Sequence, residues 1–193
     1  MSGNLARTFD LIDEANARDP AGEALRYGHR MSAKLAAFAP GASEPLQIAA
    51  RAQHIQRWTI PRSSYPEGRI AYLTWRKDLQ KLHARRAGEI MSACGYDEVA
   101  IARTGALLRK ERLKQDADAQ TLEDVICLVF LEHEADAFIA KHDDDKVRDI
   151  LAKTARKMSA AGLAEASRLA LEPRLARLLG EALSLSPPPG SPS

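Results

Sequence analysis

Residues 121–131 read TLEDVICLVFL, and this stretch decides the fold. From Val125 to Leu131 every residue is apolar, so a helix built from them has no face suited to water. A helix that is apolar on all sides must be covered by other elements of the fold. The sequence therefore predicts a helix over 121–141 at the centre of the core, with Thr121 at its start.

The chain on both sides of this stretch also has the pattern of helices. Alanine and leucine are abundant, β-branched residues are scarce, and no segment alternates apolar and polar residues with period two. We expect an all-α single-domain helical bundle of about seven or eight helices over 1–183, followed by a disordered Pro/Ser-rich tail over 184–193. The expected helices span residues 4–18, 21–38, 43–58, 69–94, 98–113, 121–141, 143–160 and 163–184, the last interrupted at Pro173.

Composition excludes several classes of protein. The 193 residues include 28 Lys and Arg against 26 Asp and Glu, a balance that does not indicate nucleic-acid binding. No apolar run approaches the roughly 18 residues that cross a bilayer, and the N-terminus lacks a signal-peptide pattern. The two cysteines, Cys94 and Cys127, suggest neither a disulfide framework nor a metal motif. These features favour a reduced, cytoplasmic protein without a membrane or duplex nucleic acid as its partner.

Three histidines fall in three different predicted helices: His29, His54 and His83. Imidazoles from separate helices can converge on one metal ion, so the three are candidate metal ligands. The alternative is structural. His54 near a helix C-terminus suits the helix dipole, and His83 suits a half-exposed helix face beside basic neighbours.

Glu123 and Asp124 lie near the start of the predicted apolar helix. The pattern Thr121-x-x-Asp124 fits a capping box, in which the carboxylate accepts a hydrogen bond from the first backbone amide. In the other interpretation Asp124, or Glu123 in its place, faces the same cavity as the histidines. The two roles exclude each other only in part, because a first-turn carboxylate can also bind a metal.

Residues 51–86 form a strongly basic region with interleaved aromatic residues. Arginine forks match phosphate geometry, and aromatic rings offer stacking faces. Each group also has a structural interpretation. Trp58 and Trp75 could be core aromatic residues, and Lys110 and Lys114 could lie on a solvated helix face. The candidate ligand-binding residues are Arg51, Arg57, Trp58, Arg62, Tyr65, Tyr72 and Arg76, with Lys110 and Lys114 at helical spacing further on.

Four strings of sequence resemble a family of uncharacterised proteins. They are AARAQHIQRWTIPRSSYP at 49–66, YLTWR at 72–76, LHA at 82–84 and QTLEDVICLVFLE at 120–132. Together they resemble the family catalogued as domain of unknown function 4202, over about residues 8–183. That resemblance names no activity.

The order of the candidate ligands resembles a second family, the HD-domain metal-dependent phosphohydrolases. The matching positions are His29, His54, His83 and then Asp124 before an apolar helix. This resemblance implies an HD-like helical bundle that holds a metal through these residues. The sequence departs from the pattern after His54, where Ile55 stands in place of the metal-binding Asp.

Two hypotheses for function follow. The first is a divergent HD-like metal-dependent phosphohydrolase acting on a small phosphorylated metabolite or nucleotide. A divalent ion (Mn, Fe, Zn or Ni) would be held by His54, His83 and Asp124, together with His29 or Glu123. The ion would activate a bound water, with Asp124 and Glu123 as the catalytic residues. The basic residues would hold the phosphate.

The second hypothesis is a non-catalytic helical module of the same fold. It would bind an anionic ligand or an acidic partner through the basic-aromatic region 51–86. Ile55 favours this hypothesis, because it removes a carboxylate from the expected metal site. Exposed leucine and alanine stripes would permit a homodimer.

Overall fold

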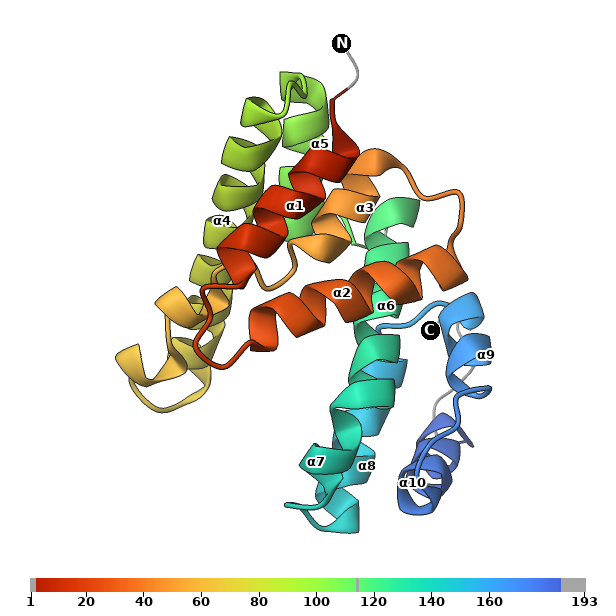
Figure 1. Ribbon diagram of the computed structural model, residues 1–193. Coiled ribbons are helices and arrows are strands. Elements are labelled where there is room, and N and C mark those ends of the chain that lie inside the picture. The colour runs from red at the N-terminus through yellow and green to blue at the C-terminus, as the bar shows by residue number, and fades with distance from the viewer. Residues whose placement is uncertain (1–2, 114, 185–193) are drawn as a thin grey trace. The chain divides into compact units, whose positions relative to one another are not determined.

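The computed structural model describes residues 3–113 and 115–184. Within these ranges every regular element is helical, with ten α-helices and two short 3-10 helices (Figure 1), which confirms the all-α prediction. The predicted helix over 121–141 is broken in two, into α6 (Ala117–His133) and α7 (Ala135–Ile139). The predicted interruption at Pro173 is confirmed, because α9 (Ala160–Ala166) ends before it and α10 (Pro173–Ser184) begins there. None of these helices combines the length and the apolar sequence of a membrane span.

The chain divides into two compact units, Met1–Leu122 and Glu123–Ser193. One domain over 1–183 stays a prediction. The boundary falls inside α6, which continues from one unit into the next. No proline, glycine or polar linker marks a boundary of this kind, so sequence patterns do not indicate it. Of the predicted tail, residues 185–193 lie outside the described residues.

The first unit is built around α3 (Glu44–Arg51), whose apolar residues Leu46, Ile48, Ala49 and Ala50 are at most 1% exposed. As the sequence predicts, Ser43 caps this helix by accepting a hydrogen bond from the Leu46 N–H. Its short side chains let neighbours approach closely. The neighbours are α1 (Leu5–Asn16), α2 (Glu23–Phe38) and α5 (Glu98–Leu108), while α4 (Arg69–Ala93) packs along α5 (Figure 1).

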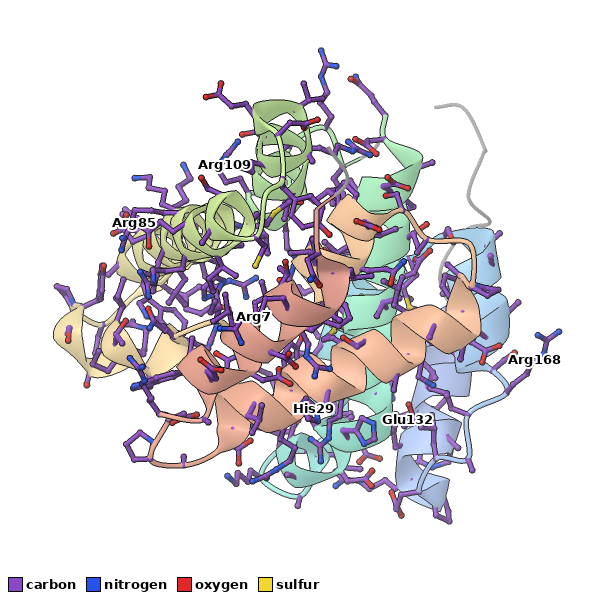
Figure 2. The ribbon with its side chains drawn as sticks, turned by 45° about the horizontal axis from the view of Figure 1, so that its top comes forward. Arg7, His29, Arg85, Arg109, Glu132 and Arg168 are labelled. Carbon is purple, nitrogen blue, oxygen red and sulfur yellow. The ribbon has the colours of Figure 1, made fainter. Side chains whose placement is uncertain are left out.

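Asp13 joins the first three helices. Arg51 of α3 donates from Nε and Nη2 to the two Asp13 carboxylate oxygens, at 2.8 and 2.5 Å. His29 of α2, labelled in Figure 2, places Nε2 3.0 Å from Asp13 Oδ2. Two predicted site residues, His29 and Arg51, therefore bind this structural carboxylate of α1.

The third helix ends at Arg51, earlier than the predicted 58, and residues 52–56 form turns. Gln56 has φ of 52°, in the left-handed region that non-glycine residues seldom adopt. Two hydrogen bonds hold it: the Gln56 N–H donates to Asn16 Oδ1 (3.2 Å), and Arg86 Nε donates to Gln56 Oε1 (2.7 Å). The helix prediction is wrong over 52–58, because these long-range bonds outweigh local propensity. His54 consequently lies in a turn.

Residues 57–68 fold back on the first turns of α4 (yellow beside α4 in Figure 1). This segment contains two 3-10 helices, η1 (Arg57–Thr59) and η2 (Arg62–Ser64). Trp75 Nε1 donates to the Ile60 carbonyl (2.8 Å), and the Tyr65 hydroxyl donates to Asp78 (2.9 Å). These bonds and the packing of Ile60 and Tyr65 on Trp75 fix the basic-aromatic segment on a rigid helix.

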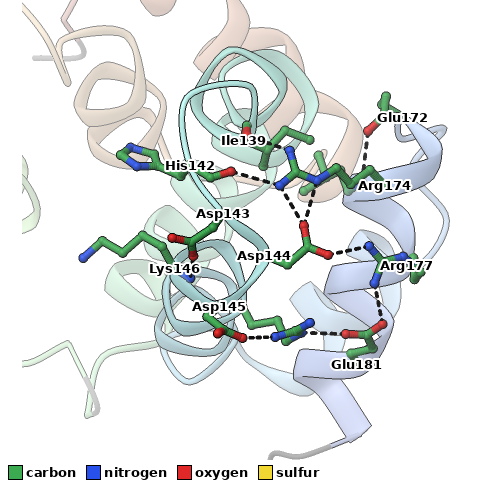
Figure 3. Close-up of polar contacts among 12 residues, drawn as sticks. Ile139, His142, Asp143, Asp144, Asp145, Lys146, Glu172, Arg174, Arg177 and Glu181 are labelled. Carbon is green, nitrogen blue, oxygen red and sulfur yellow. Dashed lines mark hydrogen bonds and ion pairs between the residues drawn. The ribbon is translucent and has the colours of Figure 1, made fainter.

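In the second unit, α10 packs against α8 (Asp144–Ala155) through a buried stripe that includes Leu175 and Leu178. A charged network accompanies this contact (Figure 3). Arg174 Nε and Arg177 Nη2 donate to the two oxygens of Asp144, at 2.9 and 2.8 Å. Arg148 Nε and Arg177 Nη1 donate to Glu181, at 2.7 and 2.8 Å. The carboxylates and guanidiniums of this network neutralise one another.

Candidate functional site

The structure brings together two of the predicted histidines. The rings of His54, in the turn after α3, and His83, on α4, have centroids 6.3 Å apart. The His54 ring stacks on Tyr27 of α2 at 3.7 Å, with an interplanar angle of 14°. His54 is half-buried, whereas His83 is 4% exposed. The buried His83 Nε2 has no hydrogen-bond partner within residues 3–113 and 115–184.

The charged groups that act on this imidazole pair are cations. Burial and then the positive charges of Arg57 and Arg76 lower the pKa of His83 to about 3. Burial also lowers the pKa of His54 well below its ordinary value, with further contributions from Arg57, His83, Arg76 and Lys110. Both rings are therefore neutral at pH 7, in a positive potential that favours an anion.

Each cation comes from a different element. Arg57, in η1, has its guanidinium carbon 4.6 Å from the ring centroid of Trp75. Arg76 lies two turns before His83 on α4, and its Nη1 donates to the Tyr72 hydroxyl (3.1 Å).

Lys110 follows α5 with φ of 58°, so it too has left-handed backbone. Gln56, directly before Arg57, shares this conformation. Backbone strain of this kind clusters at functional sites, because the surrounding structure must hold it in place. Arg112, two residues after Lys110, is left-handed as well and has no part in this region, so of these residues only Gln56, held by Asn16 and Arg86, supports the interpretation as a site.

Asp124 lies in the second unit and is 2% exposed. Its carboxylate oxygens accept hydrogen bonds from the Ser159 N–H (2.7 Å) and the Ser159 hydroxyl (2.6 Å). Ser159 in turn caps α9 by accepting from the Gly162 N–H. A side chain at Gly162 would place Cβ 2.6 Å from Asp124 Oδ1. Asp124 therefore organises the start of α9.

The predicted capping box at Thr121 is wrong. The helix begins four residues earlier, at Ala117, and the Thr121 hydroxyl donates to the Ala117 carbonyl inside it (2.9 Å). Asp116 provides the start instead, accepting from the backbone N–H groups of Asp118 and Ala119. Glu123, like Asp124, is buried, at 4% exposed.

The described residues contain no group of three or more His, Cys, Asp or Glu arranged to hold a metal ion. Ile55, at the position where the HD pattern has Asp, is 0% exposed and belongs to the core. A carboxylate at this position would be a buried charge. The residue therefore serves packing.

The remaining predicted ligand residues have several roles. Arg62 Nη1 donates to the Tyr65 carbonyl (2.9 Å), and the hydrogen bond to Asp78 raises the pKa of Tyr65. Trp58 is half-buried, and Tyr72 is exposed beside Arg76. Lys114 lies outside the described residues.

Sequence reasoning missed two parts of the site. Tyr27 stacks on His54, but in the sequence it looks like one more apolar position of α2. Asn16, which holds Gln56, is 0% exposed on the apolar stripe of α1. The signal for Asn16 was available in the sequence, because it is a polar residue within an apolar stripe.

A family model described as "Domain of unknown function (DUF4202)" matches residues 6–179. The chain belongs to this family. A comparison with curated proteins and one with solved structures each gave no match. The DUF4202 match extends over both compact units and includes the imidazole pair with its three cations.

Proposed function

We propose that this DUF4202 protein is a non-catalytic helical module that binds a small phosphorylated metabolite beside His54 and His83. One observation carries the proposal: Arg57 and Arg76 act on both of two neutral imidazoles, and Lys110 acts on one of them, His54. A phosphate there would be attracted by all three positive charges. Its oxygens would also offer a partner to the buried Nε2 of His83.

The chemistry of these side chains suits a phosphate group. A guanidinium offers several N–H donors in a plane and matches phosphate oxygens, whereas an ammonium acts as a point charge. A neutral imidazole donates one hydrogen bond without adding charge. Trp75 and Gln56 hold the Arg57 segment, so little ordering is required when the ligand binds.

Isothermal titration calorimetry at pH 7.5 and constant ionic strength tests this function, with inorganic phosphate and pyrophosphate as probes. We expect Arg57→Gln, Arg76→Gln and Lys110→Gln each to weaken pyrophosphate binding about tenfold, the loss of one charge-assisted hydrogen bond. Arg85→Gln is the matched control, because Arg85 is an exposed arginine of α4 paired with Glu89. Unchanged affinity in the three variants, or no binding by wild type, contradicts the proposal.

A second candidate is the HD-like metal-dependent phosphohydrolase. Neutral imidazoles are the form that binds metal ions, and the 6.3 Å between the ring centroids of His54 and His83 favours it. When bound, a divalent ion would lower the pKa of a water ligand. The surroundings fit such an ion poorly, however, because the charged neighbours that shift both pKa values are cations.

Elemental mass spectrometry of the purified protein separates the two functions. Near-stoichiometric Mn, Fe, Zn or Ni in wild type, lost in both His54→Ala and His83→Ala, would replace the binding module by the hydrolase. The anion-binding function predicts no such metal.

A further inference from the structure

Exposed apolar side chains gather at the start of α4. Four large hydrophobic side chains are exposed within the described residues, and three of them fall in the first two turns of α4: Ile70 (83%), Leu73 (48%) and Tyr72 (41%). Ile70 and Leu73 are three residues apart and share one face of the helix. The opposite face carries Trp75, Leu79 and Leu82, which are buried. The first two turns of α4 therefore bury one side and leave an apolar stripe uncovered.

An open groove of about 620 Å³ adjoins this stripe. Its lining runs from Tyr65 to Ala71, with Thr74, and carries one charge of each sign, on Glu67 and Arg69. Ile70 belongs to both the groove and the stripe, which makes them one continuous surface. A concave apolar surface beside an exposed helix face fits an amphipathic segment of another protein.

Positive charges border the same surface. Arg69 and Lys77 are exposed and stand one turn before and after Leu73. Among residues 3–113 and 115–184, neither has an ion-pair partner. Glu67 is the one acidic residue between positions 62 and 77 of the sequence. A ligand for this surface must combine apolar groups with negative charge.

We propose that this α4 docking surface, residues 65–77, binds an acidic amphipathic segment of a partner protein. Aliphatic side chains of the segment would cover Ile70 and Leu73, and its carboxylates would pair with Arg69 and Lys77. A second copy of the chain fits less well, because a two-fold interface would set these cations against themselves. This inference goes beyond the anion site, because it rests on four other residues: Ile70, Leu73, Arg69 and Lys77. None of the four contributes to the pKa shifts of His54 and His83.

The probe is a synthetic helical peptide of about 18 residues, with leucine at positions i, i+3, i+4 and i+7 and glutamate elsewhere. A scrambled peptide of the same composition is its control. We expect the amphipathic peptide to bind the full chain by fluorescence anisotropy, and to shift the amide NMR signals of residues 65–77.

Ile70→Ser/Leu73→Ser and Arg69→Glu/Lys77→Glu should each weaken peptide binding about tenfold or more. Val99→Ser is the matched control, because Val99 is a hydrophobe of α5 that is 79% exposed. All substituted side chains are exposed, so the variants should keep the wild-type circular dichroism spectrum.

Several results would overturn the proposal. They are no binding, equal binding of the scrambled peptide, wild-type affinity in both double variants, or shifts confined to other residues. Binding to phosphatidylserine vesicles in place of the peptide would assign the surface to lipid. Self-association abolished by Ile70→Ser/Leu73→Ser would assign it to a second copy.

Discussion

Arginines in the two compact units have opposite electrostatic surroundings. In the second unit, hydrogen bonds from Arg177 and then Arg174 lower the pKa of Asp144, so opposite charges stabilise each other. In the first unit, burial and then the positive charges of neighbouring residues, Arg57 and Arg76 among them, lower the pKa values of two imidazoles. The first arrangement connects helices, and in the second the arginines add to the effect of burial in keeping the histidines neutral.

This difference separates structural from functional charge. A fold selected for stability alone pairs its cations with carboxylates, as the network around Asp144 does (Figure 3). Positive charges beside neutral imidazoles favour an anion. The histidine region is accordingly where we propose that a ligand binds, and the Asp144 network connects helices.

The largest expected effect is a loss of stability in mild acid. The pKa of His83 is about 3 in the folded chain against 6.5 ordinarily, so the unfolded chain binds more protons between these values. Stability should therefore fall as the pH drops below 6.5, by up to about 1.4 kcal/mol per pH unit for each imidazole, or about 3 kcal/mol for His83 at pH 4.5. Urea denaturation from pH 7.5 to 4.5 measures this.

The carboxylates of the second unit do not act in that window. The pKa of Asp144 is lowered in the folded chain, so its contribution is complete above its ordinary value of 3.8 and is lost as the pH falls further. His83→Gln should reduce the slope between pH 6.5 and 4.5, and the slope that remains should come from His54, whose pKa is also lowered. A slope in His83→Gln as steep as that of wild type would contradict the assigned pKa of His83.

The next effect concerns Asp124, a buried carboxylate of the second unit. Asp124→Ala removes two charge-assisted hydrogen bonds to Ser159 and leaves a buried N–H unsatisfied. We expect a loss of about 2–4 kcal/mol in the free energy of unfolding at pH 7.5. Asp145→Ala is the control, because this side chain is 93% exposed. A loss as small as that of the control would show that Asp124 does not organise α9.

The smallest effect compares one arginine from each unit. Arg177→Gln removes a partner of Asp144 and Glu181, and should lower stability at pH 7.5. Arg76→Gln should change stability less, because His83, with a pKa of about 3, is already neutral in the folded chain at this pH. Thermal denaturation of both variants measures the two losses. A loss in Arg76→Gln as large as that in Arg177→Gln would remove the electrostatic distinction between the units.

The sequence predicts helices well and their tertiary relations poorly. Local patterns locate the buried segment after Asp124, the Ser43 cap and the break at Pro173, because spacing and turn chemistry are local. The end of α3 is different, since Asn16 and Arg86 hold Gln56 from 40 and 30 residues away. The start of α6 depends on Asp116, which the apolar run from Val125 does not reveal.

The site shows the same limit. His54, His83 and the three cations are recognisable by residue type. Their grouping depends on how α3, α4 and α5 pack, and so does the stacking of Tyr27 on His54. Asp124 carries the right chemistry for a ligand, yet its hydrogen bonds to Ser159 come from a segment 35 residues away. Residue type alone could not distinguish these roles.

Histidine NMR spectra recorded during a pyrophosphate titration at pH 7.5 test the central claim most directly. The chain has five histidines, and three of them (His29, His133 and His142) serve as internal controls. The account predicts saturable shifts of the His54 and His83 ring signals, with the other three unmoved, and loss of the shifts in Arg76→Gln. Unmoved His54 and His83 signals, or equal shifts of all five histidines, would contradict it.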